Sequence, residues 1–362
     1  PKDLALLALR FVQDEIRYLG LEEGVAGFKP NDPRLVFERR FGDCKDKSCL
    51  LQALLYMMGI DSTPLLVHSH RGELIAKSMP TPFAFDHAIL RIELPGTNYY
   101  IDPTMQLQGG SLDTTCSPAY SHGLLLSQDA PKLISFPRTI VHEPVEIETL
   151  FQVTSRDSVT YSKNTLFRGP NADFMRRVLD IYGQKDLADD ALNDLREMYG
   201  SAKIAIPFQV LDDRDANCIQ VQESYILPTR SKAKGKTLKF FSSAIEDFLD
   251  THINPERESP YALIYPLWIK EHVHVDNPFN TDDTSSSDQR TYEQESIFFA
   301  YTLNVEGGSS DYYFELKHLQ DHVPKTALRD YWELCQEIIE NAPKELHITN
   351  LKRSFSKMRL HR

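Results

Sequence analysis

The sequence predicts an α+β protein, and two observations carry that prediction. Near the N-terminus, two segments with the helical spacing of apolar residues precede short segments in which apolar and polar residues alternate. Beyond about residue 145, strand-like and helical segments mix along the chain. Helices set apart from antiparallel strands are typical of the α+β class. We therefore expect a first region at residues 1–140, with N-terminal helices packed on an antiparallel sheet, and a second mixed α+β region at residues 141–362.

Each element expected in the first region follows from a local pattern. Apolar residues at helical spacing predict a helix over residues 3–18, and a glycine- and proline-rich stretch over 20–43 predicts an irregular loop. A second helix is expected over 44–58, ending before Gly59, a residue that readily closes a helix. Strands are expected at 64–69, 87–94 and 99–102, and the last two are joined by a Pro-Gly turn that predicts a hairpin.

The second region contains more strands and three expected helices. Strand-like patterns cover residues 146–153, 157–165, 218–226, 297–305 and 312–316. Helices are expected over residues 171–199, with a break near Gly183, and over 240–251 and 325–341. Residues 282–288 are entirely polar, so we expect them to form a mobile loop. The sequence contains no internal repeat.

Charge and length exclude two classes of protein. The 362 residues carry a net charge of −12. Residues 1–140 hold 14 basic and 16 acidic residues, so the acidity lies mainly in the second region. A nucleic-acid binder needs a basic surface, so we expect no nucleic-acid partner. No stretch approaches the ~20 apolar residues of a membrane helix, so we expect no membrane span. Pro1 is not an initiator residue, so we expect the chain to be part of a longer protein.

Cysteine and histidine spacing gives little sign of a metal site. The five cysteines form no C-x-x-C pair, which argues against a zinc ribbon, and their odd number leaves at least one thiol free. Two His-x-His pairs, His68/His70 and His272/His274, could place two imidazoles on one face of a strand and bind zinc. No third ligand is evident for either pair. We therefore interpret both as paired surface histidines and expect no metal.

The segment RFGDCKDKSCLL, residues 40–51, points to a reactive thiol. Cys44 follows a Gly-Asp turn and opens the second helix, where free backbone N–H groups and the helix dipole favour a thiolate. Lys45 and Lys47 add positive charge nearby. A charged helix start is a poor place for a core residue, so we interpret Cys44 as a nucleophile. Cys49, further along the helix, is the better candidate for the core.

A nucleophilic thiol needs a base, and the base needs a third group that orients it. His87 begins an expected strand in the motif FDHAI, and Asp102 ends the paired strand in the motif YIDPT. Because a short turn joins these strands, register should bring His87 and Asp102 to similar heights. We therefore expect a Cys44–His87–Asp102 catalytic triad. Asp102 could instead be an ordinary turn residue before Pro103.

These three motifs, in this order, resemble the transglutaminase-like superfamily. The resemblance covers about residues 1–125 and also includes R-Y-x-G at 17–20 and F-K-P at 28–30. It is strongest to a bacterial branch that often follows a β-sandwich domain in exported proteins, which implies a periplasmic location. The resemblance implies a papain-like α+β fold and acyl transfer through a thioester on peptide or protein amides. It implies no cofactor.

Several alternatives stay open. Animal cross-linking transglutaminases have Trp directly after the cysteine, where this chain has Lys45, so transamidation and hydrolysis are both compatible with the motif. Tyr18 could donate to an oxyanion beside Cys44, or pack at the edge of the core. The fold could also serve as a binding module without turnover. The acidic second region would suit a basic peptide or protein partner.

Overall fold

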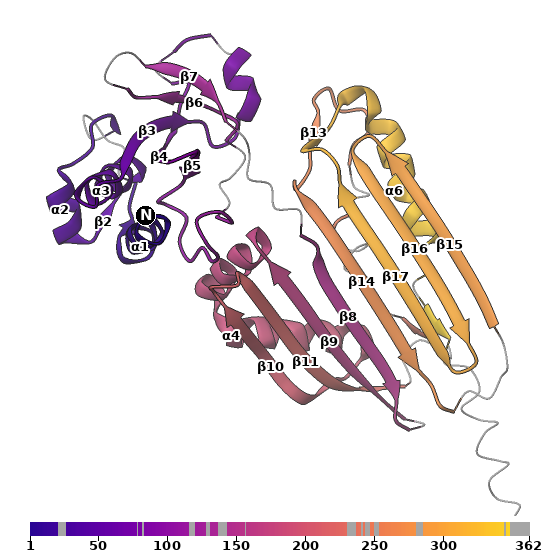
Figure 1. The fold of residues 1–362 in the computed structure, drawn as a ribbon. Coiled ribbons are helices and arrows are strands. Elements are labelled where there is room, and N and C mark those ends of the chain that lie inside the picture. The colour runs from indigo at the N-terminus through magenta and orange to yellow at the C-terminus, as the bar shows by residue number, and fades with distance from the viewer. Residues whose placement is uncertain are drawn as a thin grey trace, which may run out of the picture. The chain divides into compact units, whose positions relative to one another are not determined.

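A computed structural model describes most of the chain. The described residues are 1–20, 27–77, 79–81, 83–115, 120–127, 131–136, 143–155, 157–229, 237–239, 242, 247–249, 253–279, 285–343 and 345–347. The chain forms helices as well as strands, and the strands are arranged in several sheets, which confirms the α+β class (Figure 1). None of the helices in the described part of the chain combines the length and apolarity that crossing a bilayer requires.

The chain divides into two compact units. Unit 1 comprises residues 1–141 together with two short segments, 169–177 and 213–218. Unit 2 comprises residues 142–168, 178–212 and 219–362. The long N-terminal segment of unit 1 therefore ends one residue beyond the expected boundary at 140, but the unit also takes in two segments from the other side of that boundary.

Three helices of unit 1 pack on an antiparallel sheet, in the arrangement that the sequence predicts. The helices are α1 (Lys2–Glu15), α2 (Pro33–Arg39) and α3 (Cys44–Met57), and a 3-10 turn, η2, spans Gly72–Lys77. The five strands lie in the order β5-β4-β3-β6-β7, all antiparallel. They are β3 (Asp61–Val67), β4 (His87–Leu94), β5 (Thr97–Ile101), β6 (His122–Leu125) and β7 (Lys132–Ser135).

The core of unit 1 lies between these layers. Leu9 and Val12 of α1 and Leu51 of α3 are buried against Leu90 and Ile92 of β4. The opposite face of the sheet buries a smaller cluster, composed of Leu65, Val67, Ile89, Tyr120, Leu125 and Phe136. Alternate residues of β4 thus enter different cores, which fixes which face His87 and the rest of the strand present.

Unit 2 is built on an eight-stranded sheet with the order β10-β11-β9-β8-β14-β17-β16-β15. At its centre β8 and β14 run parallel, whereas β17, β16 and β15 are antiparallel neighbours. The strands are β8 (Val145–Val153), β9 (Ser158–Arg168), β10 (Lys203–Asp213), β11 (Cys218–Pro228), β14 (Leu267–Asp276), β15 (Ser285–Gln294), β16 (Ile297–Glu306) and β17 (Ser309–His318).

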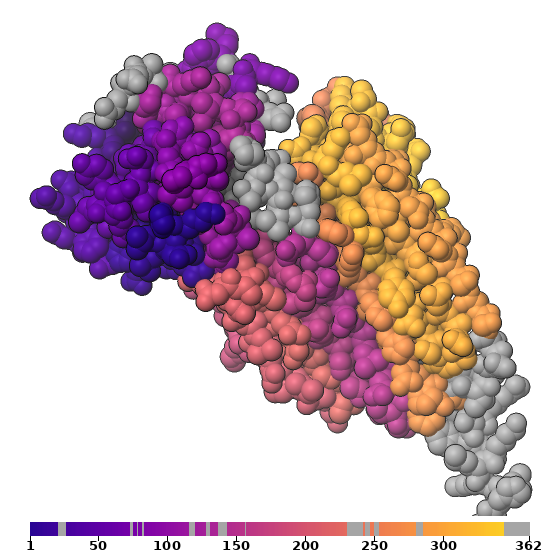
Figure 2. Space-filling view, in the orientation of Figure 1, coloured from indigo at the N-terminus to yellow at the C-terminus, as the bar shows by residue number. Residues whose placement is uncertain are grey.

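Two helices bury one face of this sheet. They are α4 (Pro170–Tyr199) and α6 (Leu328–Asn341), which contribute Leu195 and Tyr331 to the core beside Val273 and Phe314. Alternate residues of β14 point to the opposite face and are at least partly exposed. The orange to yellow surface in Figure 2 belongs to the part of unit 2 that includes β14 to β17 and α6. The remaining described elements are β12 (Thr237–Lys239), β13 (Tyr261–Ala262), β18 (His322–Val323), η3 (Lys325–Ala327) and β19 (Glu345–His347).

The described residues differ from the sequence-based expectations in several places. The first helix ends at Glu15 because the extended residues Arg17–Tyr18 (β1) pair in parallel with Phe41–Gly42 (β2). Helix α2 lies inside the expected loop, where the Asp32 side chain caps it by accepting from the Arg34 N–H at 2.8 Å. Strands β6, β7 and β10 were not among the expected strands, and β14 was expected only as the strand that holds His272 and His274. Residues 285–288, expected as part of a mobile loop, belong to β15. The helix expected over 240–251 lies largely outside the described residues.

Candidate active site

Cys44 is the first residue of α3, at the position that the sequence predicts. Asp43 caps this helix: its carboxylate accepts from the Asp46 N–H at 3.1 Å, and Asp46 reaches back to the Asp43 N–H at 3.4 Å. The first N–H groups of a helix have no intrahelical acceptor, so the positive end of the helix dipole lies at the thiol. Only 7% of Cys44 is exposed.

The carboxylates beside Cys44 are each paired with a cation. Lys45 forms an ion pair with Asp43, and Arg39 pairs with Asp46 at 2.8 Å. Asn31 also donates to Asp46, from its backbone at 2.7 Å. These contacts leave Asp43 and Asp46 as structural acceptors that hold the start of α3. Their negative charge is locally balanced, so it opposes a thiolate less than the sequence alone would indicate.

His87 lies between Cys44 and Asp102. Its Nε2 is 2.9 Å from Asp102 Oδ2, and its interaction with the Cys44 side chain contributes to the raised pKa of His87. The hairpin register pairs Leu90 with Ile101, which brings the start of β4 beside the residue that follows β5. The structure therefore assembles the three predicted residues, all within unit 1.

Electrostatics favour a protonated His87. Burial by itself would lower the pKa of His87, but the hydrogen bonds with the Asp102 carboxylate and the Cys44 sulfur raise it to about 10. Burial alone would raise the pKa of Asp102, but hydrogen bonds from His87 and Thr104 bring it below its ordinary value. An imidazolium held between a carboxylate and a thiol is the arrangement that activates a nucleophilic cysteine.

Three residues that the sequence analysis missed complete the setting of Asp102. Tyr120 donates its hydroxyl to Asp102 Oδ2 at 3.0 Å, and Thr104 donates its N–H and hydroxyl to Oδ1 at 2.8 and 2.6 Å. Gln13 Nε2 donates to the Asp102 backbone oxygen at 3.0 Å. Only Thr104 had a sequence signal, since Asp often accepts from the residue two places on in a turn. Tyr120 and Gln13 are 18 and 89 residues from Asp102.

Lys47 is fully buried one helical turn after Cys44. Its ammonium donates to the backbone oxygens of Ile16 at 2.5 Å and Gln13 at 3.3 Å, so it satisfies carbonyls at the end of α1. Burial lowers the pKa of Lys47 to about 8, although the carboxylates of Asp102 and Asp14 oppose this shift. Lys47 therefore joins α1 to α3 close to the triad.

Tyr18 and Cys49 are two further residues that the sequence analysis named. Tyr18 in β1 pairs with Gly42, two residues before Cys44, and 41% of it is exposed with the hydroxyl next to Gly20. Its role at an oxyanion stays a prediction. Cys49 is half-buried and lines a cavity of about 430 Å³ with Asn31, Gln52 and Tyr56, among others, so it is not a fully buried core residue. Burial, together with the charges of Asp46 and Asp43, raises the pKa of the Cys49 thiol.

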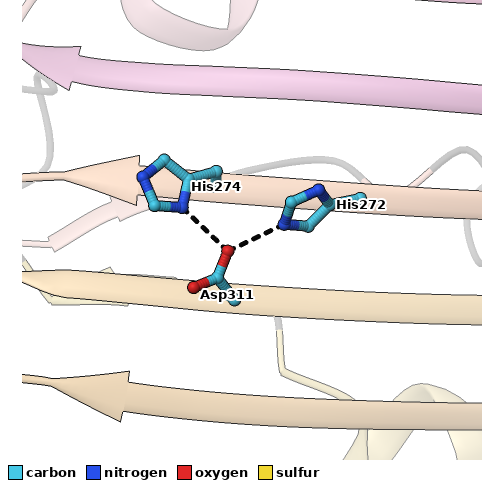
Figure 3. A group of neighbouring side chains, drawn as sticks. All are labelled: His272, His274 and Asp311. Carbon is cyan, nitrogen blue, oxygen red and sulfur yellow. Dashed lines mark hydrogen bonds and ion pairs between the residues drawn. The ribbon is translucent and has the colours of Figure 1, made fainter.

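The two His-x-His pairs have different surroundings. His68 Nδ1 accepts from the His70 N–H at 3.2 Å and lies 3.3 Å from Asp86, so that pair does not converge on one point. His272 and His274 instead both contact one carboxylate oxygen, that of Asp311 (Figure 3). Among the described residues, this is the group of three side chains whose ligand atoms could hold a metal ion.

The comparisons with known proteins give a fold likeness alone. No protein-family model matches the chain, and no match is found among curated proteins. The structure is similar to the crystal structure of a putative protease from Parabacteroides distasonis ATCC 8503, with a TM-score of 0.52 and 11% sequence identity. The alignment covers 94% of this chain and 50% of that one, so this chain spans about half the length of its structural neighbour.

Proposed function

We propose that this protein is a thiol enzyme that acts on peptide or protein amides through a thioester. The observation that supports it best is the setting of His87, whose Nε2 is 2.9 Å from Asp102 Oδ2 and whose pKa is raised by its hydrogen bonds with Asp102 and Cys44. The resemblance of the three motifs to the transglutaminase-like superfamily points to the same chemistry. The fold likeness to a protein named as a protease is compatible with it.

The proposed reaction begins at the Cys44 thiolate. The sulfur attacks the amide carbonyl carbon, and the resulting oxyanion is stabilised by free N–H groups at the start of α3. The C–N bond then breaks as the His87 imidazolium gives its proton to the leaving amine. A thioester remains on Cys44. Water or a second amine attacks that thioester and loses its proton to His87. The C–S bond then breaks, which releases the product and restores the Cys44 thiolate beside the His87 imidazolium.

Asp102 has a supporting part in this proposal. By accepting from His87 Nε2, its carboxylate directs the other ring nitrogen toward Cys44 and stabilises the imidazolium. Tyr120 and Thr104 hold the carboxylate in place, so Asp102 cannot rotate away without breaking their hydrogen bonds. We class Tyr120, Thr104 and Gln13 as positioning residues.

Thiol alkylation tests the nucleophile. Iodoacetamide at neutral pH should modify Cys44, identified by mass spectrometry, and Cys44→Ala should abolish the fast reaction. The matched control is Cys49→Ala, because the raised pKa of Cys49 keeps that thiol protonated near neutrality. Equal loss of labelling in the two variants would refute the assignment of Cys44.

Turnover tests the reaction itself. A glutamine-containing peptide is incubated with the protein, with and without a primary amine, and both ammonia release and amine incorporation are measured. Ammonia without incorporation indicates amidase activity, incorporation indicates transamidation, and cleavage of the peptide chain indicates a peptidase. A panel of unrelated peptides that gives none of these with a labelled, reactive Cys44 would favour the binding module without turnover.

A further inference from the structure

The open face of the unit 2 sheet brings two imidazoles and a carboxylate together. His274 of β14 is paired in register with Asp311 of β17, and His272 lies two residues earlier on the same face. Asp311 Oδ1 is 2.8 Å from His272 Nε2 and 2.8 Å from His274 Nδ1 (Figure 3). One ligand atom from each residue lies within 4.8 Å of the other two.

This donor set matches the preferences of zinc. Zn²⁺ in open sites is commonly bound by three protein ligands, and two histidines with one carboxylate is among the recurring sets. Bonds of 2.0–2.2 Å at tetrahedral angles separate the ligand atoms by roughly 3.3 Å. The present separations of 2.8 Å between Asp311 and each histidine fall short of that spacing by roughly half an ångström, given those bond lengths. The ligand atoms of His272 and His274 lie within 4.8 Å of each other, so the ion requires side-chain rotations on strands that are already side by side.

The surroundings keep the three side chains in place. β14 and β17 are inner strands of the eight-stranded sheet, so the backbone of the cluster is hydrogen-bonded on both sides. The His272 ring stacks on Tyr313, with centroids 4.3 Å apart and an interplanar angle of 8°. The side chains of His272, His274 and Asp311 are 33%, 35% and 30% exposed. The cluster is thus held by its neighbours and is still reachable from solvent.

A cavity of about 450 Å³ adjoins the cluster. His272 and His274 line it together with Glu148, whose position on β8 pairs with His272. A metal held by three protein ligands keeps at least one position for water or another ligand, and this cavity has room for either. The second carboxylate, Glu148, also adds negative charge beside the site, which favours a cation.

We propose that His272, His274 and Asp311 form a binding site for a divalent transition metal, and that the ion bound there is zinc. Zinc would replace the protons that the histidine nitrogens now share with Asp311. The site lies in unit 2 and does not depend on the thiol chemistry of unit 1. The alternative is that the three residues form only a hydrogen-bonded cluster.

Zinc titration tests the proposal. The full chain carries Cys44→Ala, because a thiol beside His87 could itself bind zinc, and is freed of metal with a chelator before calorimetric titration with zinc sulfate. We expect one site per chain. His274→Ala and Asp311→Ala should each weaken it by ~10- to 100-fold or more, since even loss of an outer hydrogen-bond partner typically costs that much. The matched control, His68→Ala with His70→Ala, should retain full affinity.

A second measurement guards against misfolded variants. Saturating zinc should raise the melting temperature of the parent protein, because a ligand that binds only the folded state stabilises it. The same zinc concentration should raise the melting temperature of His274→Ala much less, while the metal-free melting temperatures of the two proteins stay close. Absence of zinc binding by the parent, equal affinity in the ligand variants, or loss of binding in the His68/His70 control would overturn the proposal.

Discussion

Both carboxylate oxygens of Asp102 have hydrogen-bond partners, and these partners determine how an asparagine side chain would be oriented at this position. Oδ1 faces two donors of Thr104, one of which is a backbone N–H that cannot reverse its direction. Oδ2 faces His87 and Tyr120, whose proton positions can both change. In Asp102→Asn, the oxygen should therefore remain toward Thr104, and the NH₂ group should turn toward His87.

Asp102→Asn should consequently hold His87 in the wrong tautomer. An NH₂ group facing Nε2 forces the ring proton onto the nitrogen that faces Cys44, so His87 can no longer accept the thiol proton. The corresponding change in serine proteases costs about 10⁴ in kcat. A thiol depends less on its base, so we expect a loss of about 10- to 1,000-fold in turnover and slower alkylation of Cys44 at neutral pH. Circular dichroism should show an unchanged fold.

Pro103→Ala serves as the control for that experiment, because it alters the same turn and keeps the carboxylate. It should retain most of the activity. If Asp102→Asn left both the alkylation profile and turnover unchanged, Asp102 would be no more than a turn residue.

The raised pKa of His87 also predicts a pH dependence of stability. The folded protein binds the His87 proton up to about pH 10, whereas an ordinary histidine releases it near 6.5. This contribution to stability is therefore complete below about pH 6.5 and is lost as the pH rises toward 10. Lys47 acts in the opposite direction, since its pKa is lowered from 10.5 to about 8 and its contribution improves with pH between those values.

Urea unfolding of the native protein and of His87→Gln isolates the histidine effect. The difference in unfolding free energy between the two proteins should shrink steadily from pH 6.5 to 10. In a Cys44→Ala background the decline should move to lower pH, because one of the hydrogen bonds that raises the pKa of His87 is gone. A difference that stays constant over this range would contradict the proposed imidazolium.

At the scale of single elements, α4 contains the feature most sensitive to substitution. Gly183 interrupts the helix with φ 79° and ψ 151°, a conformation essentially restricted to glycine, at the place where the sequence predicts a break. The preceding part of α4 includes residues of unit 1, and the following part packs on the sheet of unit 2.

Gly183→Ala should lower the unfolding free energy by about 1–3 kcal/mol, because a side chain is strained in this backbone conformation although its Cβ would meet no neighbouring atom. Asp190→Ala, at an exposed position of the same helix, should raise the unfolding free energy slightly or leave it unchanged. Denaturant titration measures both. A stabilised Gly183→Ala protein would mean that the two halves of α4 can join as one continuous helix.

At the scale of the whole molecule, the N-terminal segment of unit 1 is held by residues of the same unit that lie far along the chain, in segment 213–218. Arg214 donates to Asp14 at 2.6 Å and to the Gln108 backbone oxygen at 2.9 Å, and its own oxygen accepts from the Gly110 N–H at 2.8 Å. The Gln108 side chain in turn accepts from Gln13, which supports the backbone of Asp102. A fragment that ends near residue 140 would lose this support.

Arg214→Ala should therefore destabilise unit 1 selectively. The guanidinium is partly exposed, so we expect a cost of about 1–2 kcal/mol. Both tryptophans, Trp268 and Trp332, lie in unit 2, so fluorescence would miss the change, and hydrogen exchange followed by mass spectrometry is the suitable readout. Exchange should accelerate in α1 and around residues 101–110. It should stay the same in β14–β17, and Lys185→Ala should change neither region.

The sequence alone was sufficient for features that depend on nearby residues. The helix start at Cys44, the hairpin that carries His87 and Asp102, and the break at Gly183 each follow from the chemistry of a few consecutive residues. The α+β class follows from the same local periodicities, because apolar spacing reports which face of each element is buried. Helix α2 had such a signal too, since Asp32-Pro33 is a typical helix start, but the surrounding glycines and prolines obscured it.

The tertiary structure decided which distant residues meet. Tyr120 and Gln13 reach Asp102, Arg214 joins unit 1, and Asp311 lies between His272 and His274 at 39 and 37 residues' distance. None of these contacts has a local signature, because strand order and register place the partners, and the burial of the whole sheet sets both. The sequence therefore predicted a nucleophile, its base and its orienting carboxylate, whereas the support around them and the third member of the histidine cluster emerged only from the fold.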